Sequence, residues 1–347
     1  MGFSWTTTLL LAAACGTAFA GPTESDAVAA FVSGGARPGV SQAAATADRL
    51  AAASRKLCLQ PGEGALRQAR EAWRDAYRAW RRAEPFLFGP ADKLEQRFGS
   101  WPTNAVVLDA AVSSPEYRDV RGNADVRGFP ALEHLLFAPR SAKEATAGER
   151  CAHLADVSGE VAELTRAIDR AWRQDFGKGF ASAGDGKPFL VPGDALGMAM
   201  TKAVGVTEHL LRERIGLPAG FFKAPPKADY LEAWLSRDTL DGFKAAVEGL
   251  RMSLSGGGEA AILELLATKD GLVEKKDPAL ASDIRKQLAK IERAVDGLGD
   301  GDRIRRDPAK LKGLYKQVQT LQDQLIEASL VLELDVNVIE LGARTQW

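Results

Sequence analysis

The chain has 347 residues, of which 46% are hydrophobic and 26% are charged, a composition typical of folded globular proteins rather than disordered chains. Its 45 Lys and Arg residues nearly balance 46 Asp and Glu residues, so the net charge is −1. This balance argues against a nucleic-acid partner, because nucleic-acid-binding proteins usually carry a basic footprint. Three Cys and three His residues are also too few for zinc fingers or multi-site metalloenzymes.

The first twenty residues predict export. Residues 9–14 form a short apolar core, and Ala18-Phe19-Ala20 precedes Gly21, which is the pattern of a secretory signal peptide. We predict cleavage after Ala20 and a periplasmic or cell-envelope location, although the segment before the apolar core lacks Lys and Arg. Cys15 is an alternative lipid-anchor position, which we disfavour because Ala12 stands where a lipidation motif usually has leucine. No later segment is apolar for 18 uninterrupted residues, so we expect no transmembrane helix.

Two cysteines remain after the predicted cleavage, Cys58 and Cys151. An exported protein meets an oxidising environment in which two cysteines can pair. In the chain-entropy model, closing a loop of this length stabilises the fold by ~4 kcal/mol. We therefore expect a disulfide, with two free buried thiols as the alternative.

The N-terminal half predicts a series of amphipathic helices. Residues 21–45 are rich in Gly, Ala and Ser, and we expect a flexible leader there. Over residues 63–84, apolar side chains recur at steps of three and four, which indicates a helix that Pro85 ends. The same spacing predicts helices over 154–176 and 194–215.

The C-terminal half continues the helical pattern beyond the proline-rich stretch 218–226. Strand-like alternation is almost missing, so we predict an all-α fold, and the short Gly/Pro turns favour antiparallel helical bundles. We assign residues 46–218 to an N-terminal bundle and residues 219–347 to a C-terminal bundle. Three apolar stripes predict the C-terminal helices, over residues 240–254, 284–298 and 311–332.

The stretch 127–137 is the most informative part of the chain. Pro130 suits the first turn of a helix, where its missing N–H costs nothing. Glu133 follows Phe129 by four residues and therefore shares its apolar face. An isolated buried carboxylate is very costly, so Glu133 either forms a salt bridge with an arginine of a neighbouring helix or belongs to a functional site.

Several passages, in the same order, resemble the imelysin-like proteins of bacterial cell envelopes. Together they cover residues 45–255. The resemblance implies two four-helix-type bundles packed with pseudo-symmetry, and a site near their junction. The passages are Ala69-Arg70-Glu71-Ala72-Trp73 with Trp80, Phe88-Gly89-Pro90, Trp101-Pro102, Gly128-Phe129-Pro130-Ala131-Leu132-Glu133, the run 212–218 and the run 232–236.

The family's hallmark is G-x-H-x-x-E, a motif proposed to hold a metal and first interpreted as peptidase-like. Gly128 and Glu133 match it, but Pro130 occupies the histidine position. Through the metal proposed for this motif, the resemblance implies iron or another divalent metal as the cofactor, with Glu133 as its ligand. Proline supplies no metal-binding atom at that position, which weakens both the metalloprotease and the preformed iron-site interpretations.

We therefore expect an exported imelysin-like envelope protein that binds a small ligand or an envelope protein in iron or other metal acquisition. The candidate binding residues are Gly128, Pro130 and Glu133, joined by Arg214 and Ser236, and we identify no catalytic residue. One alternative is a metallopeptidase-type hydrolase with Glu133 as general base, which lacks a recognisable metal site or nucleophile. The other is a structural or interaction protein with Glu133 in a buried ion pair.

Overall fold

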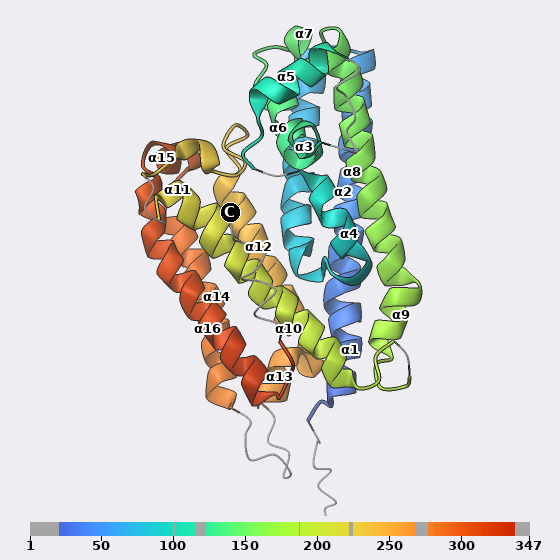
Figure 1. Ribbon diagram of the computed structural model, residues 1–347, viewed down its shortest axis with the longest axis vertical. Helices are drawn as coiled ribbons and strands as arrows, with labels where there is room; N and C mark the ends of the chain where they lie inside the picture. Colours follow the sequence, from blue (N-terminus) through green and yellow to red (C-terminus); the bar gives the residue numbers. More distant parts are fainter. Residues whose placement is uncertain are drawn as a thin grey trace, which may run out of the picture.

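The regular secondary structure is entirely helical in the part of the chain that the computed structural model describes (Figure 1). This confirms the predicted all-α class. Within the same residues, no helix is long and apolar enough to cross a bilayer. The predicted signal peptide, with Cys15, lies outside the described residues. The described ranges are 21–99, 101–114, 123–186, 188–221, 225–267 and 277–336.

Long amphipathic helices alternate with short helical turns along the described chain. The elements in order are α1 (Glu24–Ala30), η1 (Phe31–Ala36), α2 (Arg37–Leu59), α3 (Glu63–Ala83), η2 (Glu84–Phe86), η3 (Gly89–Ala91), α4 (Asp92–Glu95), η4 (Gln96–Phe98), α5 (Ala105–Ser113), η6 (Ala124–Val126), α6 (Gly128–Phe137), α7 (Ala142–Ala145), α8 (Glu149–Arg173), α9 (Asp175–Ala181), α10 (Pro192–His209), η7 (Leu210–Gly216), α11 (Leu217–Ala219), η8 (Ala228–Tyr230), α12 (Thr239–Ser255), η9 (Gly258–Ala260), α13 (Ile262–Ala267), α14 (Pro278–Gly297), α15 (Gly301–Arg306), η10 (Pro308–Leu311) and α16 (Lys312–Val331).

An N-terminal group of helices consists of α2, α3, α6 and α8. The helix α2 packs against both α3 and α8, and α6 closes the group by contacting the same two helices (Figure 1). The apolar stripe of α3 explains this packing, because Leu66, Trp73 and Tyr77 all face the interior and are buried. Sequence spacing therefore predicted which face of α3 enters the core.

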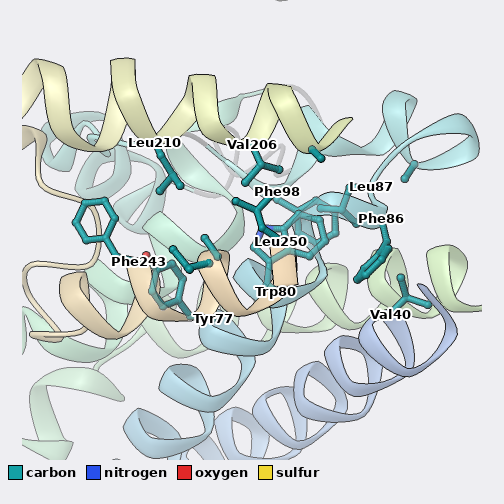
Figure 2. Packing of buried hydrophobic residues seen from close by; sticks show 14 of the residues in the cluster. Val40, Tyr77, Trp80, Phe86, Leu87, Phe98, Val206, Leu210, Phe243 and Leu250 are labelled. Atoms are coloured by element: carbon teal, nitrogen blue, oxygen red, sulfur yellow. The ribbon is translucent and has the colours of Figure 1, made fainter. Parts of the chain in front are cut away.

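A C-terminal group consists of α10, α12, α14 and α16, which pack in a ring of neighbouring pairs (Figure 1). The helix α12 also packs against α3. A Cβ atom at Gly242 would lie 2.4 Å from Tyr77 Oη, so glycine permits this close approach. Apolar side chains of both groups meet there, and Figure 2 shows Tyr77 and Trp80 of α3 near Phe243 and Leu250 of α12.

The helix α10 precedes the predicted domain boundary at residue 218 but packs against α12 and α16, which follow that boundary. The boundary stays a prediction, and this packing favours a position before Pro192 instead. The two helical groups are therefore named here by their helices rather than by the predicted ranges.

The expected flexible leader over residues 21–45 is wrong for the segment that begins at Glu24. This segment forms α1, η1 and the start of α2, and Val28, Phe31 and Val32 are buried in the core. The small residues that suggested flexibility instead allow close packing. A Cβ atom at Gly34 would lie 2.1 Å from the carbonyl oxygen of Gly256, at the end of α12.

Two π-helical segments, η1 and η7, interrupt the first long helix of each group. A π-turn inserts an extra residue into the helical register, and such turns are frequent at functional sites. In η7 Arg214 is buried together with Leu211 and Ile215. Arg214 follows Leu210 by four residues and Leu211 by three, so ordinary helical spacing also places it on their buried face.

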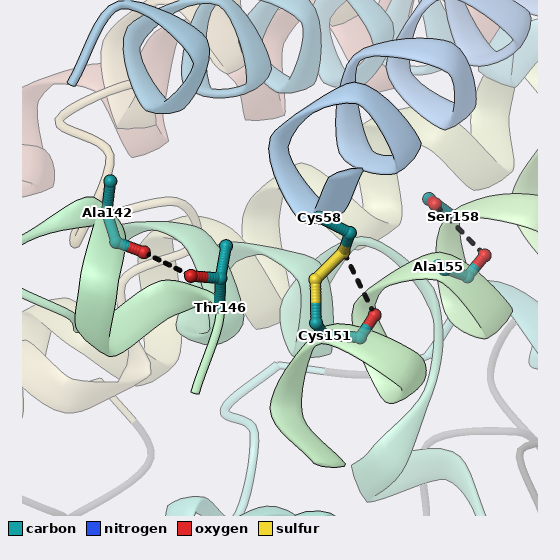
Figure 3. Close-up of a disulfide and its surroundings, with 6 residues drawn as sticks. All are labelled: Cys58, Ala142, Thr146, Cys151, Ala155 and Ser158. Carbon is teal, nitrogen blue, oxygen red and sulfur yellow. Dashed lines mark hydrogen bonds between the residues drawn. A yellow bond between two sulfur atoms is a disulfide. The ribbon is translucent and has the colours of Figure 1, made fainter. Parts of the chain in front are cut away.

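The disulfide between Cys58 and Cys151 is present and confirms the predicted pairing (Figure 3). It joins the C-terminal end of α2 to the first turn of α8, with 5.7 Å between the two Cα atoms. The alternative of two free thiols is therefore wrong. The bond links the two helices that pack most extensively in the N-terminal group.

Candidate functional site

Glu133 lies on α6 where the two helical groups meet, and it is 2% exposed. Its Oε1 accepts hydrogen bonds from the backbone N–H and the hydroxyl of Ser236, each at 2.8 Å. Its Oε2 accepts a hydrogen bond from Trp101 Nε1 at 3.2 Å. The carboxylate thus connects α6 to the segment 231–238, which leads into α12 of the C-terminal group.

Burial governs the ionisation of Glu133. It raises the pKa of this carboxyl from 4.5 to about 7, although the hydrogen bonds from Ser236 and Trp101 act in the opposite direction. The negative charge of Glu232 adds to the increase. Within the described residues the polar partners of Glu133 are Ser236 and Trp101, both neutral. The contacts of Glu133 in these residues therefore do not fit the alternative of a buried ion pair.

The segment 231–238 holds Ser236 in a tight turn. Ala233 and Arg237 have φ angles of 55° and 64°, a left-handed conformation that costs roughly 1–2 kcal/mol for residues other than glycine. The Ser236 hydroxyl also lies 3.0 Å from the carbonyl oxygen of Ala233. Its single proton can satisfy either that carbonyl or the carboxylate of Glu133, so this hydrogen bond depends on whether Glu133 is ionised.

Gly128 and Pro130 form the first turn of α6. Gly128 has a φ of 70°, and a Cβ atom there would lie 1.7 Å from the carbonyl oxygen of Phe98. Pro130 is buried in the same turn. Both residues thus fit α6 closely against the turn that follows η4, and a role for either in ligand binding stays a prediction.

Arg214 lies in a second buried polar cluster beside this carboxylate. Its guanidinium pairs with Glu84, and its Nε lies 3.1 Å from Glu232 Oε2. Arg81 pairs with Glu232 and lies 3.6 Å from Glu84. The Tyr77 hydroxyl donates a hydrogen bond to Glu232 at 3.1 Å. Two arginines and two glutamates therefore pair inside the interface, where His209 Nδ1 also lies 3.8 Å from Glu84 Oε1.

The pKa shifts of Glu84 and Arg214 favour the charged forms of both groups. Burial alone would raise the pKa of Glu84, but Arg214 and Arg81 hold it well below its usual range. Burial would likewise lower the pKa of Arg214, yet Glu232 and Glu84 raise it. Burial and Glu232 raise the pKa of Tyr77 well above its usual value, so the phenol stays protonated. Unlike these groups, Glu133 has no cation among the hydrogen-bond partners that the described residues provide.

Sequence reasoning named Glu133, Ser236 and Arg214 but missed several partners. The structure joins Glu133 directly to Ser236, whereas Arg214 belongs to the neighbouring ion-pair cluster. A signal for Arg81 and Glu84 was present at the end of α3, where both continue the apolar stripe at helical spacing. The missed residues are Tyr77, Arg81, Glu84, Trp101 and Glu232.

The donor atoms around Glu133 do not fit a resident metal ion. Across the described ranges, no group of three or more His, Cys, Asp or Glu side chains could hold one. The partners of Glu133 are hydrogen-bond donors, and the carboxylates of Glu84 and Glu232 are paired with arginines. His134 lies 3.1 Å from Asp109 rather than in this cluster. We therefore derive no chemical step that uses a bound metal.

Comparison with known proteins adds evidence from outside the chain. The sequence model of the family described as Imelysin matches residues 36–332. No curated protein matches the chain. Two solved structures share its fold. One is described as an iron-regulated protein A precursor from Parabacteroides distasonis. It is 20% identical in sequence, the match covers 90% of this chain and 97% of that chain, and the TM-score is 0.78. The other is an imelysin-like protein from Psychrobacter arcticum. It is 18% identical, the match covers 92% of this chain and 99% of that chain, and the TM-score is 0.70.

Proposed function

The chain belongs to the imelysin family, and from this premise we propose that it is an exported cell-envelope protein that binds a small ligand or partner protein in iron or other metal acquisition. The solved structure described as an iron-regulated protein supports the link to iron. We propose a binding role without catalysis, at the junction where Glu133 contacts Ser236.

The observation that carries this proposal is the uncompensated carboxylate. Glu133 is buried between two helical groups, and its partners are a serine and a tryptophan rather than a cation. Removing a carboxylate from water without a cation is costly, and strongly perturbed carboxyls gather at functional sites. A role in binding explains why this position carries a carboxylate although an apolar residue would pack at lower cost.

The burial of Glu133 also indicates how a ligand would reach it. Ser236 is 1% exposed, so the 231–238 segment must move before a ligand can contact the carboxylate. The left-handed residues Ala233 and Arg237 raise the energy of the closed segment. We propose that the ligand replaces Ser236 as the partner of Glu133.

The opening that a ligand requires argues against a hydrolase, because it would separate Ser236 from Glu133. The Ser236 hydroxyl donates to Glu133 at 2.8 Å, which is the distance of a nucleophile–base pair. In this conformation neither group can contact a substrate, because both are almost fully buried. Hydrolysis of a peptide library by the wild-type protein, and its loss in Glu133→Gln, would favour the peptidase alternative instead.

Calorimetry tests the binding proposal. Wild-type protein is titrated with ferric citrate and with ferrous iron, at a pH of about 8 where Glu133 is ionised. We expect one of these probes to bind, and its affinity to fall at least about tenfold in Glu133→Gln. Glu71→Gln is the matched control, because Glu71 lies on the exposed face of α3. Equal affinity in all three proteins, or no binding of either probe, would contradict the proposed site.

Export is tested separately by the mass of the secreted form. Cleavage after Ala20 gives a mature protein that begins at Gly21. A mass that retains residues from Cys15 onward with an attached lipid would show a lipid-anchored protein instead.

A further inference from the structure

Residues 303–316 concentrate positive charge on a chain whose net charge is −1. Asp307 is the one acidic residue of this segment. Six basic side chains of the segment are exposed, and we call them the basic end: Arg303, Arg305, Arg306, Lys310, Lys312 and Lys316.

The packing of this segment directs its charges outward. The helix α15 and the turn η10 contact α11 and η8 at one end of the C-terminal group (Figure 1). Ile304 and Leu311 are fully buried and anchor the segment. Among the described side chains, acidic groups offset part of this charge. Asp307 lies 3.5 Å from Lys310, and Asp300 accepts a hydrogen bond from the backbone N–H of Arg303.

Cations cover aromatic rings at this end of the protein. The Arg305 guanidinium lies 4.1 Å from the centre of the Trp234 ring, and Lys312 lies 5.7 Å from that of Phe221. Such contacts hold the cations in place while leaving their charge available to solvent. Leu217 of α11 adds an apolar side chain that is 39% exposed.

We propose that the basic end binds peripherally to an anionic phospholipid bilayer. A bilayer surface fits because clustered Lys and Arg residues gain favourable energy from anionic headgroups without needing a matched shape. An acidic protein partner fits less well, because protein interfaces usually centre on exposed aromatic anchors. Here the rings of Trp234 and Phe221 lie beneath cations.

This membrane contact is separate from the proposed ligand site but lies beside it in space. Trp234, which Arg305 covers, belongs to the same 231–238 segment as Ser236. Binding through the basic end would therefore place the junction between the helical groups near the bilayer. Membrane binding through the basic end requires no ligand at Glu133.

Vesicle co-sedimentation of the mature chain tests the proposal. We expect binding to vesicles that contain phosphatidylglycerol, none to vesicles of phosphatidylcholine alone, and a steep loss of binding as salt rises. A triple variant should bind vesicles with a partition coefficient at least about a hundredfold lower, because three attractive charges become repulsive. It combines Arg303→Glu, Arg306→Glu and Lys316→Glu.

A matched triple variant controls for the change in net charge. Arg49→Glu, Arg55→Glu and Arg67→Glu alter three exposed cations of α2 and α3 and should leave vesicle binding close to that of wild type. Circular dichroism verifies that both variants fold. Absence of wild-type binding, equal loss in both variants, or binding that ignores salt would each overturn the proposal. Binding to polyglutamate but not to vesicles would overturn it in favour of an acidic polypeptide.

Discussion

Replacing Glu133 with glutamine should change how the stability of the protein depends on pH. The pKa of Glu133 is about 7 in the folded protein, against its ordinary value of 4.5. This difference corresponds to about 3 kcal/mol, because one pKa unit is worth ~1.4 kcal/mol. Since Glu133 is 2% exposed, solvent screens little of this free-energy difference.

The folded protein binds the proton of Glu133 more tightly than the unfolded chain does, and this sets the direction in which stability changes with pH. Below 4.5 Glu133 is protonated in both the folded and the unfolded chain, and its contribution to stability is fully present. As pH rises from 4.5 to about 7, the unfolded chain releases this proton first. The free energy of unfolding therefore falls over this interval and levels off above it.

Glutamine cannot ionise, so Glu133→Gln removes this dependence. Urea unfolding is measured for both proteins between about pH 5 and pH 8, where the linear-extrapolation analysis gives the free energy of unfolding. We expect wild type to lose about 2–3 kcal/mol relative to the variant as pH rises through this interval. Glu71→Gln controls for the loss of one negative charge. If the difference in unfolding free energy between wild type and Glu133→Gln stays constant within ~0.5 kcal/mol over this pH range, the burial of an uncompensated carboxylate is refuted.

Three further tests concern the partners of Glu133, the ion-pair cluster and the disulfide. Ser236→Ala removes one hydrogen bond to the carboxylate and should lower stability by about 1.5 kcal/mol near pH 8, and by less near pH 5, in the same urea assay. Arg214→Met leaves Glu84 buried without its closest cation, so thermal unfolding should show a loss of about 3–5 kcal/mol, and adding Glu84→Gln should restore part of it. An equal or larger loss in that double variant would contradict the ion pair. Cys58→Ser with Cys151→Ser should cost ~4 kcal/mol by the chain-entropy model, and an unchanged unfolding midpoint would contradict it.

Helix content and core faces followed from the sequence because both depend on local spacing. The helix predicted over 63–84 is observed as Glu63–Ala83, and the one predicted over 311–332 as Lys312–Val331. Their apolar stripes repeat at a helical period, so each stripe identifies its buried face. The N-terminal helices were missed because their small residues look like a linker until the partner surface of α12 is known.

The site could be predicted only in part. Glu133 stood out as a carboxylate on an apolar face, and this local pattern needs no knowledge of the fold. Its partner Ser236 lies 103 residues away along the chain, and its inclusion rested on the family resemblance. Arg81 and Glu84 continue the apolar stripe of α3, but charges at these positions look like an ordinary helix surface until the fold brings Arg214 against Glu84. Long-range pairing of this kind leaves no periodic trace in the sequence.

Hydrogen exchange at the Ser236 amide tests most directly whether a ligand replaces Ser236 at Glu133. This N–H donates to the buried carboxylate in the closed structure and should therefore exchange slowly. Exchange is measured by NMR or mass spectrometry with and without whichever probe, ferric citrate or ferrous iron, binds in calorimetry. We predict that the ligand accelerates exchange at Ser236 in wild type and not in Glu133→Gln. Unchanged exchange in wild type saturated with that ligand would contradict the proposed role of this junction.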